Sequence, residues 1–184
     1  RKTLVVAQFS MSLALLACSI VVSRQMDFIR TKDLGYDRSN IIYFTPQPKL
    51  SQNYQTFRTE LMRDPSIVSS SQGDSHPMNV FNNDYALWDG VPEDAPVTVQ
   101  TSVCDYDFLS TMGFSLKSGR LFSKELASDS SAFIINEAMA DLMGFKDPIG
   151  KKLKVFTFTG HIVGIIKDFH NNNLYSPIDP VVFL

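Results

Sequence analysis

Hydrophobic and polar positions divide the chain into one long apolar run at its start and a series of short alternating segments after it. Residues 4–22 contain no charged side chain, no proline and no glycine. The core of a bilayer needs about 20 helical residues at about 1.5 Å each. The run therefore predicts a transmembrane helix. Arg1 and Lys2 precede it, which places the N-terminus in the cytoplasm by the positive-inside rule.

Two other interpretations of this run stay open. A secretory signal peptide also begins basic and then apolar, but its apolar region is usually about 7–15 residues long. A core helix of a soluble protein is the second alternative, because Gln8, Ser10 and Ser12 interrupt the run. In a membrane these polar side chains would face neighbouring helices rather than lipid. They therefore indicate a protein with several membrane helices, of which this chain is a piece.

Residues 23–35 read as a polar continuation of the same helix. Met26 and Ile29 keep the helical spacing, and Gly35 follows Leu34 as a candidate C-cap. A helix over residues 3–34 would be about 45–50 Å long and would stand clear of the membrane as a stalk. We therefore expect residues 1–35 to form a transmembrane helix and stalk, with the chain outside the cytoplasm after about residue 23.

The segment after the stalk predicts a strand–helix–strand unit. Residues 40–45 read as a buried strand that ends before Pro46. Residues 51–63 place Tyr54, Phe57 and Leu61 on one face of a helix. Residues 67–73 form a plausible second strand.

The pattern loosens after this unit. Residues 74–96 contain four prolines or glycines, one strand candidate at 85–88, and a turn at Asp89-Gly90. Residues 97–103 alternate cleanly, which indicates a half-buried strand. We expect this looser stretch to belong to an insert that covers roughly residues 74–125.

The last third predicts a second strand–helix–strand unit. Asp105 is a candidate N-cap for a helix over 106–112, and Asn136 for a helix that ends at Gly144. The expected strands are 114–123 in part, 132–135, 151–159, 161–167, and one that begins at residue 181 and stops with the chain. The predicted fold class is therefore α+β.

Composition excludes some functions. The formal net charge is −2 with acids and bases scattered, so no basic stripe exists that would bind nucleic acid. Cys18 lies in the apolar run and Cys104 outside it, so the two cysteines do not form a disulfide. No metal-motif spacing occurs.

Asp168 and His170 form the most enzyme-like pair. They would share one face of a strand, but a metal site needs a third ligand at suitable spacing, and the sequence has none. Asn136 and Glu137 look like a cap and an acid in the first turn of a helix rather than a catalytic pair. We expect a turn at 168–170 and no catalytic, metal or cofactor residue.

Other candidates also favour structural roles. The glycines are not spaced as a phosphate loop and suit turns and caps (Gly113, Gly119, Gly144 and Gly150). No Ser-His-Asp set assembles from the serines and histidines (Ser10, Ser12, His76, His161 and His170). The aromatic residues Phe81, Tyr85 and Trp88 predict either the core of a small subdomain or an exposed recognition surface. No ligand-binding residue can be assigned.

Six short segments, in order, resemble a known family: residues 1–10 (RKTLVVAQFS), 33–38 (DLGYDR), 118–123 (SGRLFS), 134–140 (IINEAMA), 144–151 (GFKDPIGK) and 162–170 (IVGIIKDFH). Together they resemble the MacB-like periplasmic core domain of FtsX/MacB-type ABC transporter permeases, in the form common in Bacteroidetes. The resemblance covers nearly the whole chain.

The resemblance implies a periplasmic core domain over 36–184, built of porter-like βαβ units with a smaller, strand-rich, sabre-like insert. It implies location in the bacterial inner membrane and no enzymatic activity, since the ATPase lies on a separate domain or subunit. The implied partners are that ATPase and a second permease copy, with a periplasmic adaptor and an outer-membrane channel as further candidates. No cofactor is implied. The family continues past the strand at residue 181, so we expect this chain to be truncated there.

The main hypothesis is mechanotransmission, in which cytoplasmic ATP hydrolysis drives shape change outside the membrane. The outcome would be export or efflux of a peptide, antibiotic or lipoprotein, or control of a periplasmic partner. An extracytoplasmic domain that senses antimicrobial peptides is the alternative. A secreted hydrolase is a third hypothesis, but the sequence offers it no active site. No motif identifies the substrate. No motif shows whether this is the first or the second such domain of a duplicated permease.

Overall fold

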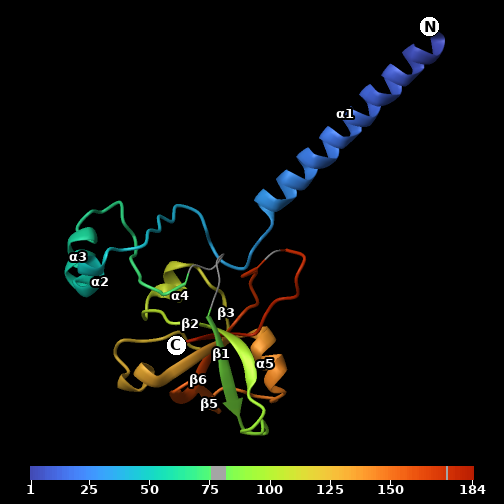
Figure 1. The fold of residues 1–184 in the computed structure, drawn as a ribbon. Coiled ribbons are helices and arrows are strands. Elements are labelled where there is room, and N and C mark those ends of the chain that lie inside the picture. The colour runs from blue at the N-terminus through green and yellow to red at the C-terminus, as the bar shows by residue number, and fades with distance from the viewer. Residues whose placement is uncertain (76–81, 173) are drawn as a thin grey trace. The chain divides into compact units, whose positions relative to one another are not determined.

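The computed structural model describes residues 1–75, 82–172 and 174–184 of the chain (Figure 1). These residues fall into two compact units, Arg1–Asp33 and Leu34–Leu184. Leu34 and Gly35 therefore belong to the second unit. Each unit is described by itself below.

The first unit is one helix, α1 (Lys2–Thr31). Among the described residues it is the one helix that is long and apolar enough to cross a membrane. It ends earlier than predicted, because Lys32 adopts an extended conformation at its C-terminus. The prediction that Gly35 caps this helix is wrong. Residues 34–37 instead enter the core of the second unit, which a continuing helix would prevent.

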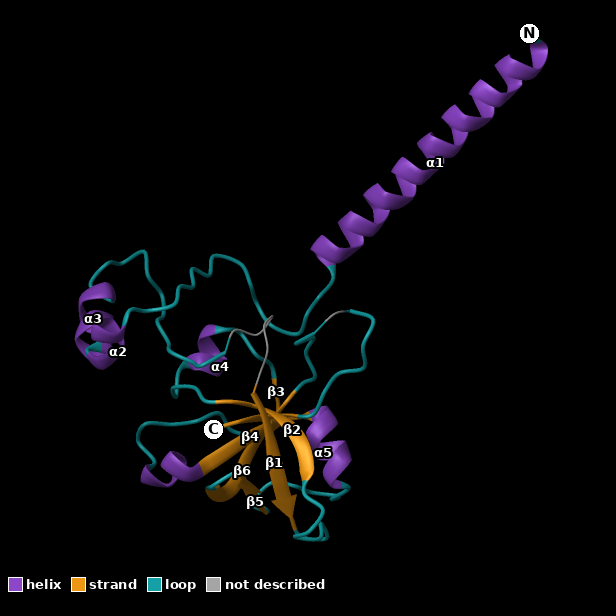
Figure 2. Cartoon of the chain, in the orientation of Figure 1, coloured by secondary structure: helices purple, strands orange, loops and turns teal. Residues whose placement is uncertain are grey.

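The second unit is built on one mixed sheet (Figure 2). Its strands run in the order β3-β6-β4-β7-β2-β1-β5, and β5 also pairs with β6. This last pairing closes six strands into a ring, with β3 beside the second half of β6. The strands are β1 (Asn82–Trp88), β2 (Val97–Ser102), β3 (Leu116–Gly119), β4 (Ala132–Asn136), β5 (Lys152–Val155), β6 (Phe158–Ile166) and β7 (Val181–Phe183).

Two short helices, α2 (Pro48–Gln52) and α3 (Tyr54–Leu61), precede the described strands. Three more lie between strands: α4 (Phe108–Thr111), a 3₁₀ helix (Ala127–Ser131) and α5 (Glu137–Met143). β4 and β6 are parallel neighbours, and α5 lies between them in the chain. The predicted strand–helix–strand unit of the last third is therefore confirmed. α5 begins after Asn136 and ends at Gly144, as expected.

Apolar side chains cover both faces of the sheet. All five residues of β4 are buried, and alternate residues enter different clusters. Ile134 packs with α4 and the aromatic residues near it, whereas Ile135 packs with α5. Since neighbouring strand residues point to opposite faces, β4 and β7 form the centre of a layered core.

The first predicted strand–helix–strand unit is wrong in its strands. Residues 40–45 and 67–72 are irregular, and only Gly73 forms an isolated bridge, with Cys104. Ile42 and Val68 are both 91% exposed. The helix of this unit exists as α2 and α3, separated at Asn53. A strand needs regular pairing of its backbone groups with a neighbour, and the pairing of residues 67–73 with residues 104–105 is confined to Gln72 and Gly73.

Other elements differ in detail. Residues 151–159 are not one strand, because the chain turns at Phe156 (φ 50°) and β5 and β6 form a hairpin. The helix predicted over 106–112 is shorter, and Asp105 is not its N-cap residue. β1 and β2, expected in an insert, belong to the same sheet as β4. The subdomain boundaries of the insert stay a prediction.

Candidate functional site

The chain enters the second unit through residues 34–37, which we call the anchor. Leu34 and Tyr36 are only 8% and 7% exposed. The Leu34 carbonyl oxygen accepts a hydrogen bond from the His170 backbone N–H at 2.8 Å. The Asp37 N–H donates to the Met112 carbonyl at 2.9 Å. The anchor is thus held by backbone bonds to two separate segments of the domain.

Gly35 is required at the centre of the anchor. Its φ is +88°, a conformation that favours glycine. A Cβ atom there would lie 2.7 Å from the Asp168 carbonyl oxygen and 2.8 Å from Phe169 Cα. Both atoms belong to backbone, so neither moves aside easily. The glycine therefore allows the anchor to approach residues 168–170 closely.

Aromatic rings surround the anchor. The Tyr36 ring lies 5.7 Å from Phe114 and 6.4 Å from Phe169, centroid to centroid. Phe169 in turn lies 4.8 Å from Phe114 and 6.0 Å from Phe183 of β7. Tilted and edge-on pairs at such distances are favourable arrangements of aromatic rings. The anchor is therefore part of the main core and not an attachment on its surface.

Asp168 links the anchor to α5. Its Oδ1 accepts a hydrogen bond from the Ala138 N–H at 2.9 Å, and its own N–H donates to Glu137 Oε2 at 2.9 Å. Lys117 Nζ lies 2.5 Å from Glu137 Oε1. The hydrogen bond from Lys117 lowers the pKa of Glu137, whereas burial raises the pKa of Asp168. These contacts give Asp168 a role at the start of α5.

Asn136 has the capping role that the sequence predicts. Its Oδ1 accepts hydrogen bonds from the Met139 N–H at 3.0 Å and the Val181 N–H at 2.9 Å. Its Nδ2 donates to the Asp179 carbonyl at 2.9 Å. This buried side chain thus joins β4, α5 and the start of β7.

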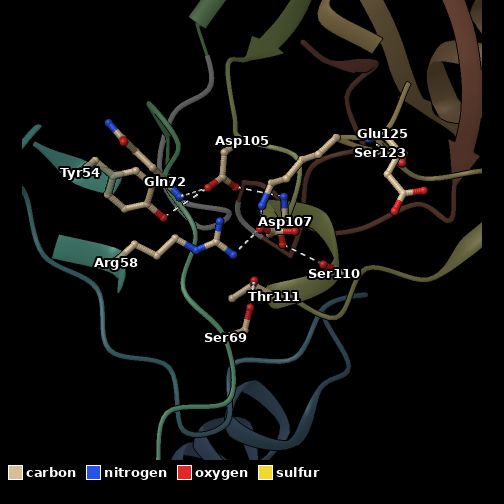
Figure 3. A network of polar contacts seen from close by, with 11 residues as sticks. Tyr54, Arg58, Ser69, Gln72, Asp105, Asp107, Ser110, Thr111, Ser123 and Glu125 are labelled. Atoms are coloured by element: carbon tan, nitrogen blue, oxygen red, sulfur yellow. Dashed lines mark hydrogen bonds and ion pairs between the residues drawn. The ribbon is translucent and has the colours of Figure 1, made fainter. Parts of the chain in front are cut away.

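A second group of polar contacts joins α3 to the loop before α4 (Figure 3). Asp105 Oδ2 accepts hydrogen bonds from the Tyr54 hydroxyl at 3.3 Å and the Gln72 N–H at 3.0 Å. Burial raises the pKa of Asp105. Asp105 therefore holds both α3 and the returning chain.

Asp107 is the ionic part of this group. Its Oδ2 pairs with both Arg58 of α3 and Lys124. The hydrogen bond from Lys124, followed by the contacts with Arg58, lowers the pKa of Asp107. Ser69 Oγ lies 2.6 Å from Thr111 Oγ1 and adds a contact between hydroxyls. The contacts drawn in Figure 3 are thus all between polar or charged groups.

The candidates from the sequence lie on different elements. Asp168 and His170 contact the start of α5 and the anchor, and the described residues include no group of three His, Cys, Asp or Glu side chains placed to hold a metal. His161 is exposed on β6, and Ser10 and Ser12 are exposed on α1. That the chain has no catalytic, metal or cofactor residue stays a prediction.

The remaining candidates are structural or untested. Gly113, Gly119, Gly144 and Gly150 all have positive φ, as turns and caps require. Tyr85 is 61% exposed, whereas Trp88 packs partly against the core face that α5 covers. Phe81 and His76 lie outside the described residues.

Sequence reasoning missed the anchor and the polar group. The segments 33–38 and 162–170 are far apart in the sequence, and nothing in either indicates that they touch. The signal that would have helped is Gly35 itself, because a glycine after a helix also suits close approach of two backbones. The pattern placed Tyr54 on one face of a helix with Phe57 and Leu61, and Arg58 carried no signal, since charged residues on a short helix are common.

Comparison with solved structures gives three similar domains. A domain of a putative permease from Porphyromonas gingivalis is 18% identical (TM-score 0.48), and the alignment covers 69% of this chain and 54% of that one. The extracellular domain of the noncanonic ABC-type transporter YknZ from Gram-positive bacteria is 14% identical (TM-score 0.50; 77% and 69%). The periplasmic region of MacB from Actinobacillus actinomycetemcomitans is also 14% identical (TM-score 0.45; 67% and 60%).

These likenesses concern the fold alone, and the chain spans about half the length of the Porphyromonas gingivalis structure. Curated proteins include no match. The family model of the MacB-like periplasmic core domain, however, matches residues 9–184, nearly the whole chain. The chain belongs to the MacB-like periplasmic core domain family.

Proposed function

We propose that this chain is the extracytoplasmic domain, with its membrane helix, of an ABC transporter permease and that it passes movement between the membrane and the domain. The observation that carries the proposal is the anchor. Residues 34–37 follow α1 closely in sequence and are built into the domain core by backbone bonds and a required glycine. A displacement at this point therefore acts on the core directly.

The route from the anchor into the domain is continuous. The anchor contacts residues 168–170, Asp168 contacts the first turn of α5, and Asn136 ties α5 to β7. Closely packed cores transmit strain because they contain little free volume. Movement of the anchor would therefore reach β4 and β7 at the centre of the sheet.

The finer parts of the proposal are drawn by analogy with the family. ATP would be hydrolysed by a separate domain or subunit, and the chain itself would be non-catalytic. A second permease copy would complete the membrane part in the bacterial inner membrane, with a periplasmic adaptor and outer-membrane channel as further partners. The work performed would be export of a peptide, antibiotic or lipoprotein, or control of a periplasmic partner.

Inserting two glycines after Gln25 in the full-length permease tests the coupling. Glycine pairs weaken a helix, so the insertion should soften α1 beyond the apolar run. We expect ATP hydrolysis to remain measurable while transport falls at least tenfold. The matched control is the same insertion after Gly90, in an open turn of the domain. Full transport by the Gln25 insertion would contradict the proposal that α1 passes movement to the domain.

A further inference from the structure

Tyr36 of the anchor carries the one buried side-chain nitrogen or oxygen, among the described residues, that has no hydrogen-bond partner. Its ring is 7% exposed in the main core, and its hydroxyl oxygen is fully buried. Because the hydroxyl is already enclosed, a further chain lying on the outside of the domain would not reach it. We propose that Tyr36 is a release element, whose hydroxyl opposes the packed position of the anchor and lowers the free energy needed to displace it.

The buried polar side chains elsewhere in the described part of the domain all have hydrogen-bond partners. They are Thr101, Ser102, Asp129, Asn136 and Asn171. An enclosed hydroxyl without a partner has lost the hydrogen bond that it makes with water in a displaced or unfolded chain, and this loss penalises the packed state. The domain therefore accepts such a penalty at the anchor, where the chain enters the core.

The rings around Tyr36 offer it packing but no acceptor for its hydroxyl. The Phe114 ring lies 5.7 Å away and the Phe169 ring 6.4 Å away, centroid to centroid. Burial raises the pKa of the Tyr36 hydroxyl, an effect that the charge of Arg38 only partly offsets. The ring thus favours the packed anchor through apolar burial, whereas the hydroxyl opposes it. A phenylalanine would keep the first contribution and remove the second.

Displacing the anchor exchanges hydrogen bonds rather than simply losing them. The Leu34 carbonyl accepts from the His170 N–H, and the Asp37 N–H donates to the Met112 carbonyl. Water replaces the partner in each once the anchor moves outward, so the net contribution of these bonds is small. The Tyr36 hydroxyl, in contrast, gains a hydrogen bond that it lacks when packed. The anchor should therefore open locally, at a smaller free energy than global unfolding.

The use of this opening in transport rests on the proposed function, whereas the opening itself does not. Amide hydrogen exchange of the full chain in detergent, followed by NMR, measures it in Tyr36→Phe. The His170 and Asp37 N–H groups report on the anchor directly. We expect both to exchange at least fivefold more slowly than in the unmodified chain, and the midpoint of urea denaturation to rise. The matched control is Tyr85→Phe, at a tyrosine that is 61% exposed, and it should change neither measurement.

The opposite sign overturns the proposal. Faster exchange or a lower midpoint in Tyr36→Phe would mean that the hydroxyl has a partner in the packed anchor, a buried water included. Unchanged exchange would mean that the anchor opens without moving Tyr36. The proposal also fails if His170 and Asp37 in the unmodified chain are as strongly protected as the β4 amides, because the anchor then opens only with the whole domain.

Transport by the full-length permease that carries Tyr36→Phe separates this inference from the proposed function. Slower exchange at the anchor together with slower transport supports both. Slower exchange with unchanged transport supports the release element and contradicts the proposed passage of movement through the anchor.

Discussion

The anchor and the segment of residues 42–71, which we call the arm, are neighbours in sequence but are attached to the domain by opposite means. Residues 34–37 are held by buried rings and backbone bonds around Gly35, whereas residues 42–71 are held by accessible polar side chains. Apolar burial contributes about 25 cal/mol per Å² and is not screened by salt. Exposed polar pairs contribute roughly 0–1 kcal/mol each. The chain thus builds one segment into the core through apolar burial and attaches the next one through polar contacts.

Truncating one aromatic side chain in each region should give the largest contrast. Phe169→Ala removes a ring that packs against Tyr36, Phe114 and Phe183, so we expect a loss of about 3–5 kcal/mol of unfolding free energy. Phe44→Ala in the arm should cost less than about 1 kcal/mol, because Phe44 is 56% exposed. Urea denaturation of the full chain in detergent measures both. Equal losses would show that the arm belongs to the core.

A methyl group at Gly35 should have the next largest effect. Gly35→Ala forces a strained φ and a contact with two backbone atoms, which together should cost about 2–4 kcal/mol. Gly90→Ala is the matched control, since Gly90 has a similar φ but no atom within 4 Å of the added carbon. It should cost about 1 kcal/mol. Thermal or urea denaturation distinguishes them, and equal costs would mean that close approach at Gly35 is unimportant.

The smallest effects concern the pH dependence of Asp105 and Asp107 in the polar group (Figure 3). Burial raises the pKa of Asp105 above its usual 3.8, and the hydrogen bond from Lys124 lowers that of Asp107 below 3.8. A lowered pKa means that Asp107 stabilises the fold above pH 3.8 and loses this contribution as the pH falls through its lowered value. A raised pKa, as in Asp105, has the opposite effect on stability. Ionised Asp105 therefore costs stability at neutral pH, and acid relieves that cost.

Two substitutions separate these signs. At pH 7, Asp107→Asn should lower the unfolding free energy by up to about 1 kcal/mol, and the difference from the unmodified chain should vanish only below pH 3.8. Asp105→Asn should be as stable as the unmodified chain or slightly more stable at pH 7. As the pH falls, this difference in unfolding free energy should begin to shrink while the pH is still above 3.8, because the pKa of Asp105 is raised. Urea denaturation between pH 3 and 7 measures both, and differences of the same sign would refute the assignment.

Where the sequence predicted correctly, the signal was local. The unit of β4, α5 and β6 was evident from a buried apolar run, a capping Asn136 and a terminating Gly144, all of which act within a few residues. The long apolar run likewise indicated α1, because helix length and lack of charge are properties of the segment alone. Caps and periodicity depend on neighbours along the chain, so no tertiary information was needed.

Where the sequence failed, the deciding partners were distant. Residues 40–45 have the composition of a strand, yet a strand forms only when another strand pairs with it. Gly35 looked like a helix cap because nothing nearby in sequence shows that residues 168–170 approach it. The polar group depends on α3 meeting the loop before α4, and no local pattern pairs Tyr54 with Asp105 or Arg58 with Asp107.

The sequence by itself therefore determined the apolar helix, the α+β class, the second strand–helix–strand unit and the family. These rest on short-range periodicity, caps and ordered motifs. Only the tertiary structure decided that the sheet closes through β5 and β6, that the anchor is part of the core, and that α3 meets the loop before α4 through polar contacts. Each of these depends on contacts between residues far apart in the chain, and local propensities carry no information about which distant residues meet.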